Sequence, residues 1–186
     1  MRIEYLYRFP VKGLSAEAIE MAEVEPGGAI PWDRAFALAQ GDSGFDPAAP
    51  VWLRKSNFMC QQRNARIALL RSLFDDKTGT MAIRAPDGSE IEADALSADG
   101  RARIGAFLAA FLGEETRGAP AFHHVEGHVF GDARTPSVSL INLASHREYE
   151  ARAGARRHRR RFRANVWFSG AAPWAERDWI GRTIQM

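Results

Sequence analysis

A run of arginines carries the clearest chemical signal in this sequence. Six of the eight residues from 156 to 163 are arginines, and Asn165 follows two positions later. In an extended conformation, Arg161, Arg163 and Asn165 would share one face of a strand. Guanidinium groups bind phosphate oxygens in pairs, so this face predicts a site for a phosphorylated ligand. We expect the arginines of the run up to Arg160 to be solvated.

Three other stretches carry polar groups that could meet an anion. Lys12 follows the segment "RIEYLYRFP", and Arg34 stands beside Asp33 at the head of "DRAFAL". From these stretches alone, we expect Lys12 to be exposed and Arg34 to pair with Asp33. Ser145 and Glu148 have the S-x-x-E spacing of a capping box, at a helix start whose free N–H groups attract anions.

Cysteine and histidine give little support for a metal site. Cys60 is the single cysteine, which excludes an intramolecular disulfide and an all-cysteine zinc site, and we expect it to pack internally. The segment "FHHVEGHVFGD" holds His123, His124 and His128, which we interpret as solvated loop residues because Gly127 argues against a helix. P-loop, G-x-G-x-x-G, G-x-S-x-G and H-E-x-x-H motifs are absent.

Composition narrows the class of partner. The chain has 186 residues, 46% of them hydrophobic and 26% charged, with a net charge of only +2. Nucleic-acid-binding domains usually spread positive charge over a whole face, so the composition argues against a nucleic-acid partner. The sequence shows no signal peptide and no run near the roughly 20 apolar residues that span a bilayer. We expect a soluble cytoplasmic protein without a membrane partner.

Strands are the main elements predicted to position these residues. Alternating apolar residues predict strands over residues 2–9, 19–28 and 33–40. Residues 66–94 predict a meander of antiparallel strands, with turns at "DKTG" and "PDGS".

Helical periodicity occurs in two segments. One face of a helix over residues 101–112 collects the apolar residues Ile104, Phe107, Leu108, Phe111 and Leu112. A second helix is predicted from Ser145 to Gly154. Residues 113–136, rich in Gly, Pro and His, are expected to form a linking loop. The sequence therefore predicts an α+β fold that is mainly β, with one domain over residues 1–115 and another over 116–186.

Taken in order, these segments resemble one family. "YRFPVKGLSAEAIEMAEVEPGGAIPWDRAFAL" is similar to the N-terminal domain that precedes MOSC domains. "SVSLINLASHREYEARAG", "RRFRANVWFSG" and "WAERDWIGRTIQM" resemble the first part of the MOSC domain, the module named after the C-terminus of molybdenum cofactor sulfurase. The resemblance implies an N-terminal β-rich unit followed by a partial MOSC β-barrel with short helices.

The resemblance also implies a cofactor and an activity class. Relatives bind a molybdenum cofactor of the molybdopterin type between the two units. They include amidoxime-reducing oxidoreductases and the sulfurase tail that occurs fused to a pyridoxal-phosphate desulfurase, so a redox or sulfur-donor partner protein is implied. The positions that match cofactor-binding residues of the family are Lys12, Arg34, Thr135, Asn142, Ser145, Arg163 and Asn165.

The sequence lacks one feature of the family, a cysteine. In the family, a cysteine that ligates molybdenum or carries sulfur follows the "W…D.WIG..I" segment, whereas this sequence ends at Met186 directly after it. Cys60 does not match that cysteine, and molybdenum chemistry needs a soft thiolate ligand. We therefore expect a chain truncated before the family's cysteine, with enzymatic activity left open. Sheet edges left unpaired by the missing strands predict a homodimer.

Three functions remain open from the sequence. The first is a MOSC-type enzyme, or an inactive remnant of one. The second is a protein that holds a phosphorylated ligand without catalysis. The third is a nucleic-acid-binding protein that uses residues 156–163, whose affinity would depend steeply on salt.

Overall fold

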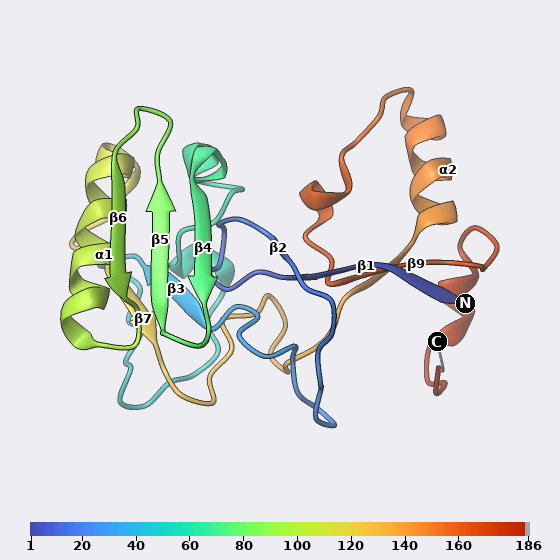
Figure 1. Cartoon of the computed structure of the whole chain (residues 1–186), viewed down its shortest axis with the longest axis horizontal. Coiled ribbons are helices and arrows are strands. Elements are labelled where there is room, and N and C mark those ends of the chain that lie inside the picture. The colour runs from blue at the N-terminus through green and yellow to red at the C-terminus, as the bar shows by residue number, and fades with distance from the viewer. Residues whose placement is uncertain (185–186) are drawn as a thin grey trace. The chain divides into compact units, whose positions relative to one another are not determined.

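The computed structural model describes residues 1–184, which divide into two units whose segments alternate along the chain (Figure 1). The terminal unit combines Met1–Arg8, Ala18–Pro31 and the chain from Ser137 onward. The central unit combines Phe9–Glu17 and Trp32–Pro136. The fold is mixed α+β and mainly sheet, which confirms the predicted class. The domain boundary at residue 115 remains a prediction, as does the partial barrel.

A three-stranded antiparallel meander forms one side of the central unit. Its strands are β4 (Arg71–Asp75), β5 (Thr80–Arg84) and β6 (Glu90–Asp94), joined by tight turns where "DKTG" and "PDGS" predict them. Phe74, Met81, Ile83 and Ala93 alternate toward the core, whereas Leu73 on β4 faces outward and is 63% exposed. The predicted meander is confirmed, except that Ala65–Leu69 form a 3-10 helix.

A second pair of strands lies in the same unit. The strand predicted over residues 33–40 is present as β3 (Phe36–Ala39), and it pairs antiparallel with β7 (Ala121–His124). The loop predicted over residues 113–136 is therefore wrong in its middle, because Phe122 is buried in the core and the backbone around it pairs with β3. Phe36 lies at the centre of this core, with ring centroids 4.9 Å from Phe74 and 5.7 Å from Phe122.

Helix α1 (Ala98–Leu112) contacts β6 and β7. The Ser97 hydroxyl caps its first turn by accepting from the N–H of Gly100, and Gly113 ends it at φ 55°. The predicted apolar face is confirmed: Ile104, Leu108 and Leu112 are buried, and the two phenylalanines of that face are partly buried against the same core.

Position 100 requires a glycine because α1 approaches the end of β6 closely there. A Cβ atom at this position would lie 1.9 Å from the carbonyl oxygen of Asp94. Gly100→Ala would raise helix propensity, but we expect it to destabilise the protein by about 1–3 kcal/mol because backbone must shift to make room. Thermal unfolding followed by circular dichroism measures this, and a stabilised variant would contradict the packing.

The sheet of the terminal unit brings together strands from both ends of the sequence. Its order is β2 (Glu17–Ala18), β1 (Arg2–Arg8), β9 (Val166–Ser169) and β8 (Leu140–Asn142). β1 runs antiparallel to β9, β8 runs parallel to β9, and helix α2 (Leu143–Ala153) follows β8 directly and contacts both β8 and β9. The strand predicted over residues 2–9 is confirmed.

The strand predicted over residues 19–28 is wrong, because none of these residues forms a strand. Only Glu17–Ala18 pair as a strand, with one further backbone bond from the Ile19 N–H to the Leu6 carbonyl. Met21 is 81% exposed and Val24 is 44% exposed, so this stretch has no apolar surface against which a strand face could pack. Among the described residues, no helix is both long and apolar enough to cross a membrane.

Candidate functional site

Lys12 is the most deeply buried cation of the central unit. Its backbone N–H donates to the Phe36 carbonyl at 2.8 Å, next to a bridge between Val11 and Phe36. The side chain is 7% exposed, and Nζ donates to the carbonyls of Phe130 at 2.9 Å and Gly131 at 3.4 Å and to Oδ1 of Asp132 at 2.5 Å. An ammonium has three protons, so each has an acceptor here. The exposed lysine expected from the local sequence is wrong.

Arg34 lies beside this lysine at a strained backbone position. Its φ is 54°, which is uncommon for a non-glycine residue. The backbone is held there because the Arg34 N–H donates to the Phe9 carbonyl and the Arg34 carbonyl accepts from Phe130, both at 2.8 Å. The guanidinium lies 5.0 Å from the Phe9 ring centroid and donates to Asp33, as expected from the sequence. The other oxygen of Asp33 accepts from the Phe9 N–H at 2.7 Å.

The charges of this central group balance. Burial lowers the pKa of Lys12, the hydrogen bond and charge of Asp132 oppose that shift, and the positive charge of Arg34 adds to it. Burial would raise the pKa of Asp132, but the hydrogen bond from Lys12 and the charges of Lys12, Lys55 and Arg34 lower it below its usual range. Two cations thus face two carboxylates, those of Asp33 and Asp132.

The second group of predicted residues lies in the terminal unit at the start of α2. Asn142, not Ser145, is the N-cap, because its Oδ1 accepts from the Ala144 N–H at 3.0 Å. Its Nδ2 donates to the Ala172 carbonyl at 2.8 Å. The capping box predicted at Ser145 is wrong: the Ser145 hydroxyl lies inside the helix and accepts from the Trp174 N–H at 2.8 Å. Both residues therefore hold the segment around residues 172–174 against the helix.

Asn165 is almost completely buried, with 1% of its surface exposed. Its Oδ1 accepts from the N–H of Ser139 at 3.1 Å and from the Ser139 hydroxyl at 2.8 Å. Its Nδ2 donates to the carbonyl of Tyr7 at 3.1 Å. The side chain therefore ties β1 to the residue that precedes β8.

The strand face predicted for Arg161, Arg163 and Asn165 is wrong. Residues Arg159–Phe162 form a 3-10 helix, and Arg163 follows it at φ 53° before the strand begins at Val166. Phe162 accounts for the turn, because it packs edge-on against the rings of His146, Tyr149 and Trp167. Arg163 is half-buried in the terminal unit, and Thr135 is exposed in the central unit.

Arg159 has a structural role that the sequence did not predict. Its guanidinium lies 3.7 Å from the Tyr5 ring centroid, and its Nε donates to the Tyr7 hydroxyl at 2.9 Å. The expectation that the run is solvated up to Arg160 is therefore wrong for this residue. The sequence feature that could have predicted this contact is the alternation of Tyr5 and Tyr7 on a predicted strand, because tyrosine rings on one face attract a guanidinium.

We expect Arg159→Ala to lower the free energy of unfolding by about 1–2 kcal/mol, because it removes a cation–π contact and a hydrogen bond. Arg161→Ala is the matched control, since Arg161 is an exposed member of the same run. It should change stability by less than about 0.5 kcal/mol. Urea unfolding measures both, and equal losses would show that the Arg159 contacts contribute nothing specific.

The three clustered histidines pack against aromatic rings instead of lying in solvent. His123 lies 5.0 Å from Phe45 between ring centroids, and His128 lies 4.7 Å from Phe130. Burial lowers the pKa of both. The solvated histidines expected from the sequence are therefore wrong at these positions. Cys60 is buried, as expected for a packing residue, and no group of three or more potential metal ligands occurs within residues 1–184.

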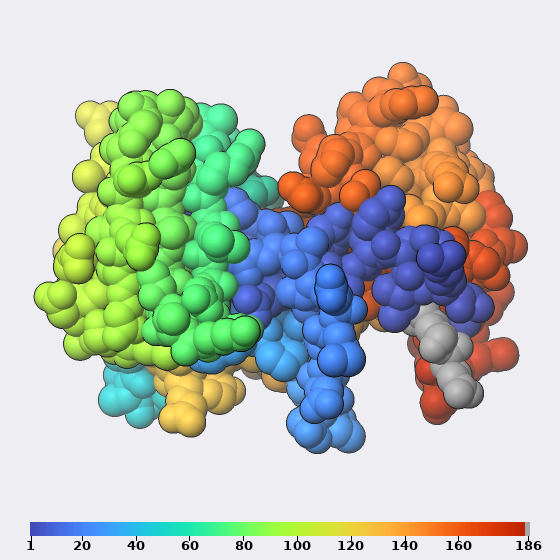
Figure 2. Space-filling view, viewed as in Figure 1, coloured from blue at the N-terminus to red at the C-terminus, as the bar shows by residue number. Residues whose placement is uncertain are grey.

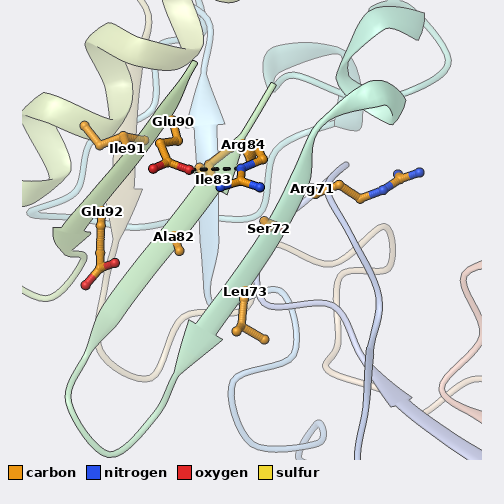
Figure 3. A pocket seen from close by; sticks show the side chains of 9 residues that line it. All are labelled: Arg71, Ser72, Leu73, Ala82, Ile83, Arg84, Glu90, Ile91 and Glu92. Atoms are coloured by element: carbon orange, nitrogen blue, oxygen red, sulfur yellow. Dashed lines mark hydrogen bonds and ion pairs between the residues drawn. The ribbon is translucent and has the colours of Figure 1, made fainter. Parts of the chain in front are cut away.

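A concave surface lies elsewhere in the central unit, on the outer face of the meander (Figure 3). This open hollow has a volume of about 670 Å³ and is lined by both charged and apolar side chains of β4, β5 and β6. Arg84 and Glu90 pair across it at 2.6 Å. In the space-filling view, the green surface of these strands is not covered by other parts of the chain (Figure 2). None of the seven residues predicted to bind the cofactor lines this surface.

Comparison with protein families identifies the N-terminal part of the chain. A family model described as the MOSC N-terminal beta barrel domain matches residues 1–115. No curated protein matches the sequence.

Proposed function

This chain belongs to the MOSC family through its N-terminal beta barrel domain, and we propose that it binds a molybdenum-pterin cofactor through the phosphate of that cofactor. The family is linked to molybdenum cofactor binding. When bound, such a cofactor supplies redox or sulfur-transfer chemistry, so the proposed activity class is oxidoreductase or sulfur carrier. The identifying match covers the region that contains both Lys12 and Arg34.

The observation that carries the proposal is the buried ammonium of Lys12 next to the guanidinium of Arg34. Burial lowers the pKa of Lys12, and groups whose pKa is shifted by burial and charged neighbours cluster at functional sites. The donors fit a phosphate, because a guanidinium and an ammonium both bind its oxygens. Lys12 and Arg34 of the central unit would bind the phosphate, and Arg163 is a candidate through the family resemblance alone.

The amide and hydroxyl residues have a supporting role in this proposal. The side chains of Asn142, Ser145 and Asn165 already make hydrogen bonds within the terminal unit. They would orient the backbone around α2 and β9 instead of contacting the ligand. Thr135 is exposed and could offer its hydroxyl.

The test is to load the full chain with the cofactor and to measure molybdenum by elemental analysis and pterin by fluorescence. We expect Arg163→Ala to weaken binding by about 1.5–3 kcal/mol, the range for a hydrogen bond to a charged group. Arg157 is half-buried, so Arg161→Ala, at an exposed position of the same run, is the control and should have almost no effect, because an exposed charge contributes little in water. Equal losses at every arginine from 156 to 163 would instead indicate nucleic-acid binding.

Nucleic-acid binding by the arginine run has less support. The Arg159 guanidinium stacks on Tyr5, and the Phe162 ring packs against side chains of α2 and β9. Both groups are therefore already engaged in contacts that binding to a phosphate or a base would have to replace. The domain boundary at residue 115, the homodimer, the redox or sulfur-donor partner and the cytoplasmic location remain predictions from the sequence.

A further inference from the structure

The three acceptors of the Lys12 ammonium come from three consecutive residues. Phe130 and Gly131 contribute backbone carbonyls, and Asp132 contributes its carboxylate. These acceptors differ in how easily they can leave. The carbonyls belong to the backbone of a segment whose Phe130 is 2% exposed, whereas the Asp132 side chain is 70% exposed.

The charge balance of the group decides what an incoming anion would meet. Arg34 is paired with Asp33, and Lys12 is paired with Asp132. An anion that approached this arrangement would find both cations already neutralised and a carboxylate at the entrance. Removing the Asp132 carboxylate from Lys12 would leave one positive charge in excess, which is what a phosphate needs.

We propose that Asp132 is an internal anion that occupies the phosphate position at Lys12, and that a phosphorylated ligand binds by replacing its carboxylate. This inference rests on the proposed function, because it concerns the same lysine. It adds a residue that sets which anions can bind.

The surroundings of Asp132 allow the carboxylate to move. Lys55 is exposed and lies close enough for its charge to act on Asp132, so it offers a second cation for the released carboxylate. Arg134, two residues further on, stacks 5.0 Å from the Trp52 ring centroid, which keeps this segment near residues 52–55.

Competition with a carboxylate also predicts selectivity by charge. A monoanion that replaces Asp132 exchanges one negative charge for another and gains little. A dianion brings a second negative charge to Lys12 and Arg34, whose side chains are only 7% and 18% exposed, so it gains more. Asp132 should thereby favour phosphate dianions over carboxylates and chloride.

The experiment compares anion binding by the full chain and its variants, using calorimetry at constant ionic strength. The probes are inorganic phosphate, at a pH where it is a dianion, and acetate. We expect Asp132→Asn to bind phosphate about tenfold more tightly or better, because a charge-assisted competitor is lost. The same variant should bind acetate measurably and so lose part of its preference for phosphate.

Glu126→Gln is the matched control, because it removes one negative charge from an exposed turn of the same unit. It should leave phosphate binding unchanged, which separates displacement from a general change in net charge. Asp132→Ala is a second variant in case the asparagine still accepts from Lys12, and thermal unfolding confirms that each variant is folded.

The outcomes separate this inference from the proposed function. If phosphate binding is lost in Lys12→Met but unchanged in both Asp132 variants, the Lys12 site stands and the competition is overturned. If phosphate binding does not respond to Lys12→Met, or occurs in none of the proteins, both the Lys12 site and the competition are overturned.

Discussion

Phe36→Ala is expected to lower the free energy of unfolding by about 3–5 kcal/mol, the range for deleting a fully buried aromatic ring. Phe36 is 0% exposed, and its ring contacts those of Phe74, Phe122 and Trp32. These rings come from separate segments of the central unit, so no single neighbour can move to fill the space. Urea unfolding followed by circular dichroism measures the loss.

Leu73→Ala is the control for Phe36, because Leu73 lies on the outer face of β4 and is 63% exposed. It should change stability by no more than about 0.5 kcal/mol. A loss below about 1 kcal/mol for Phe36→Ala would show that the ring cluster does not form the core of this unit.

Asn165→Ala is expected to cost about 2–4 kcal/mol, because it leaves buried groups without their partner. The Ser139 N–H, the Ser139 hydroxyl and the Tyr7 carbonyl all bond to this side chain. The family resemblance assigns Asn165 to the cofactor, whereas the structure gives it a role in joining β1 to the chain before β8. Stability of the chain without ligand distinguishes these two roles.

A residue that only contacted the cofactor would leave stability unchanged when replaced. If Asn165→Ala unfolds at the same urea concentration as the parent chain and loses only cofactor binding, the structural role is wrong. If both properties fall, the loss of binding follows from disruption of the terminal sheet. Arg161→Ala again provides the exposed control in the neighbouring segment.

Local sequence patterns predicted the elements whose own residues carry the signal. The meander over β4–β6 was predictable because turn residues separate short alternating strands, and α1 was predictable because Ile104, Leu108 and Leu112 repeat at helical spacing. The strand β7 was missed because glycine, proline and histidine surround it, and its only apolar anchor is Phe122. Pairing with β3, far away in sequence, decides its conformation.

The errors in the terminal unit arise from tertiary contacts that outweigh local preference. Asn142 and Ser145 can both cap a helix, and the backbone N–H of Trp174 engages the serine and leaves the asparagine as the cap. The arginine run could have extended as a strand, but Phe162 packs against Trp167 and the chain turns. Neither contact is visible in the residues immediately around the cap or the run.

The sequence predicted that Lys12 and Arg34 belong to a phosphate-binding site, but it did not predict how their side chains are arranged. The resemblance identified Lys12 and Arg34, yet the local sequence suggested that the lysine is exposed. Its acceptors lie about 120 residues further along, as the separation of 118 positions between Lys12 and Phe130 shows. The role of Asp132 follows only once this distant segment is placed beside the lysine.

The pairing of β1 with β9 has a consequence for synthesis on the ribosome. Leu6 pairs with Val166, so β1 waits for β9, the last strand within residues 1–184. At about 5–20 residues per second, β1 remains without that partner for roughly 8–30 s. All segments of the central unit are complete by Pro136, so that unit can fold earlier in translation. During the interval, the edge of β1 that will pair with β9 is open in the nascent chain, so β1 is a segment that chaperones would protect.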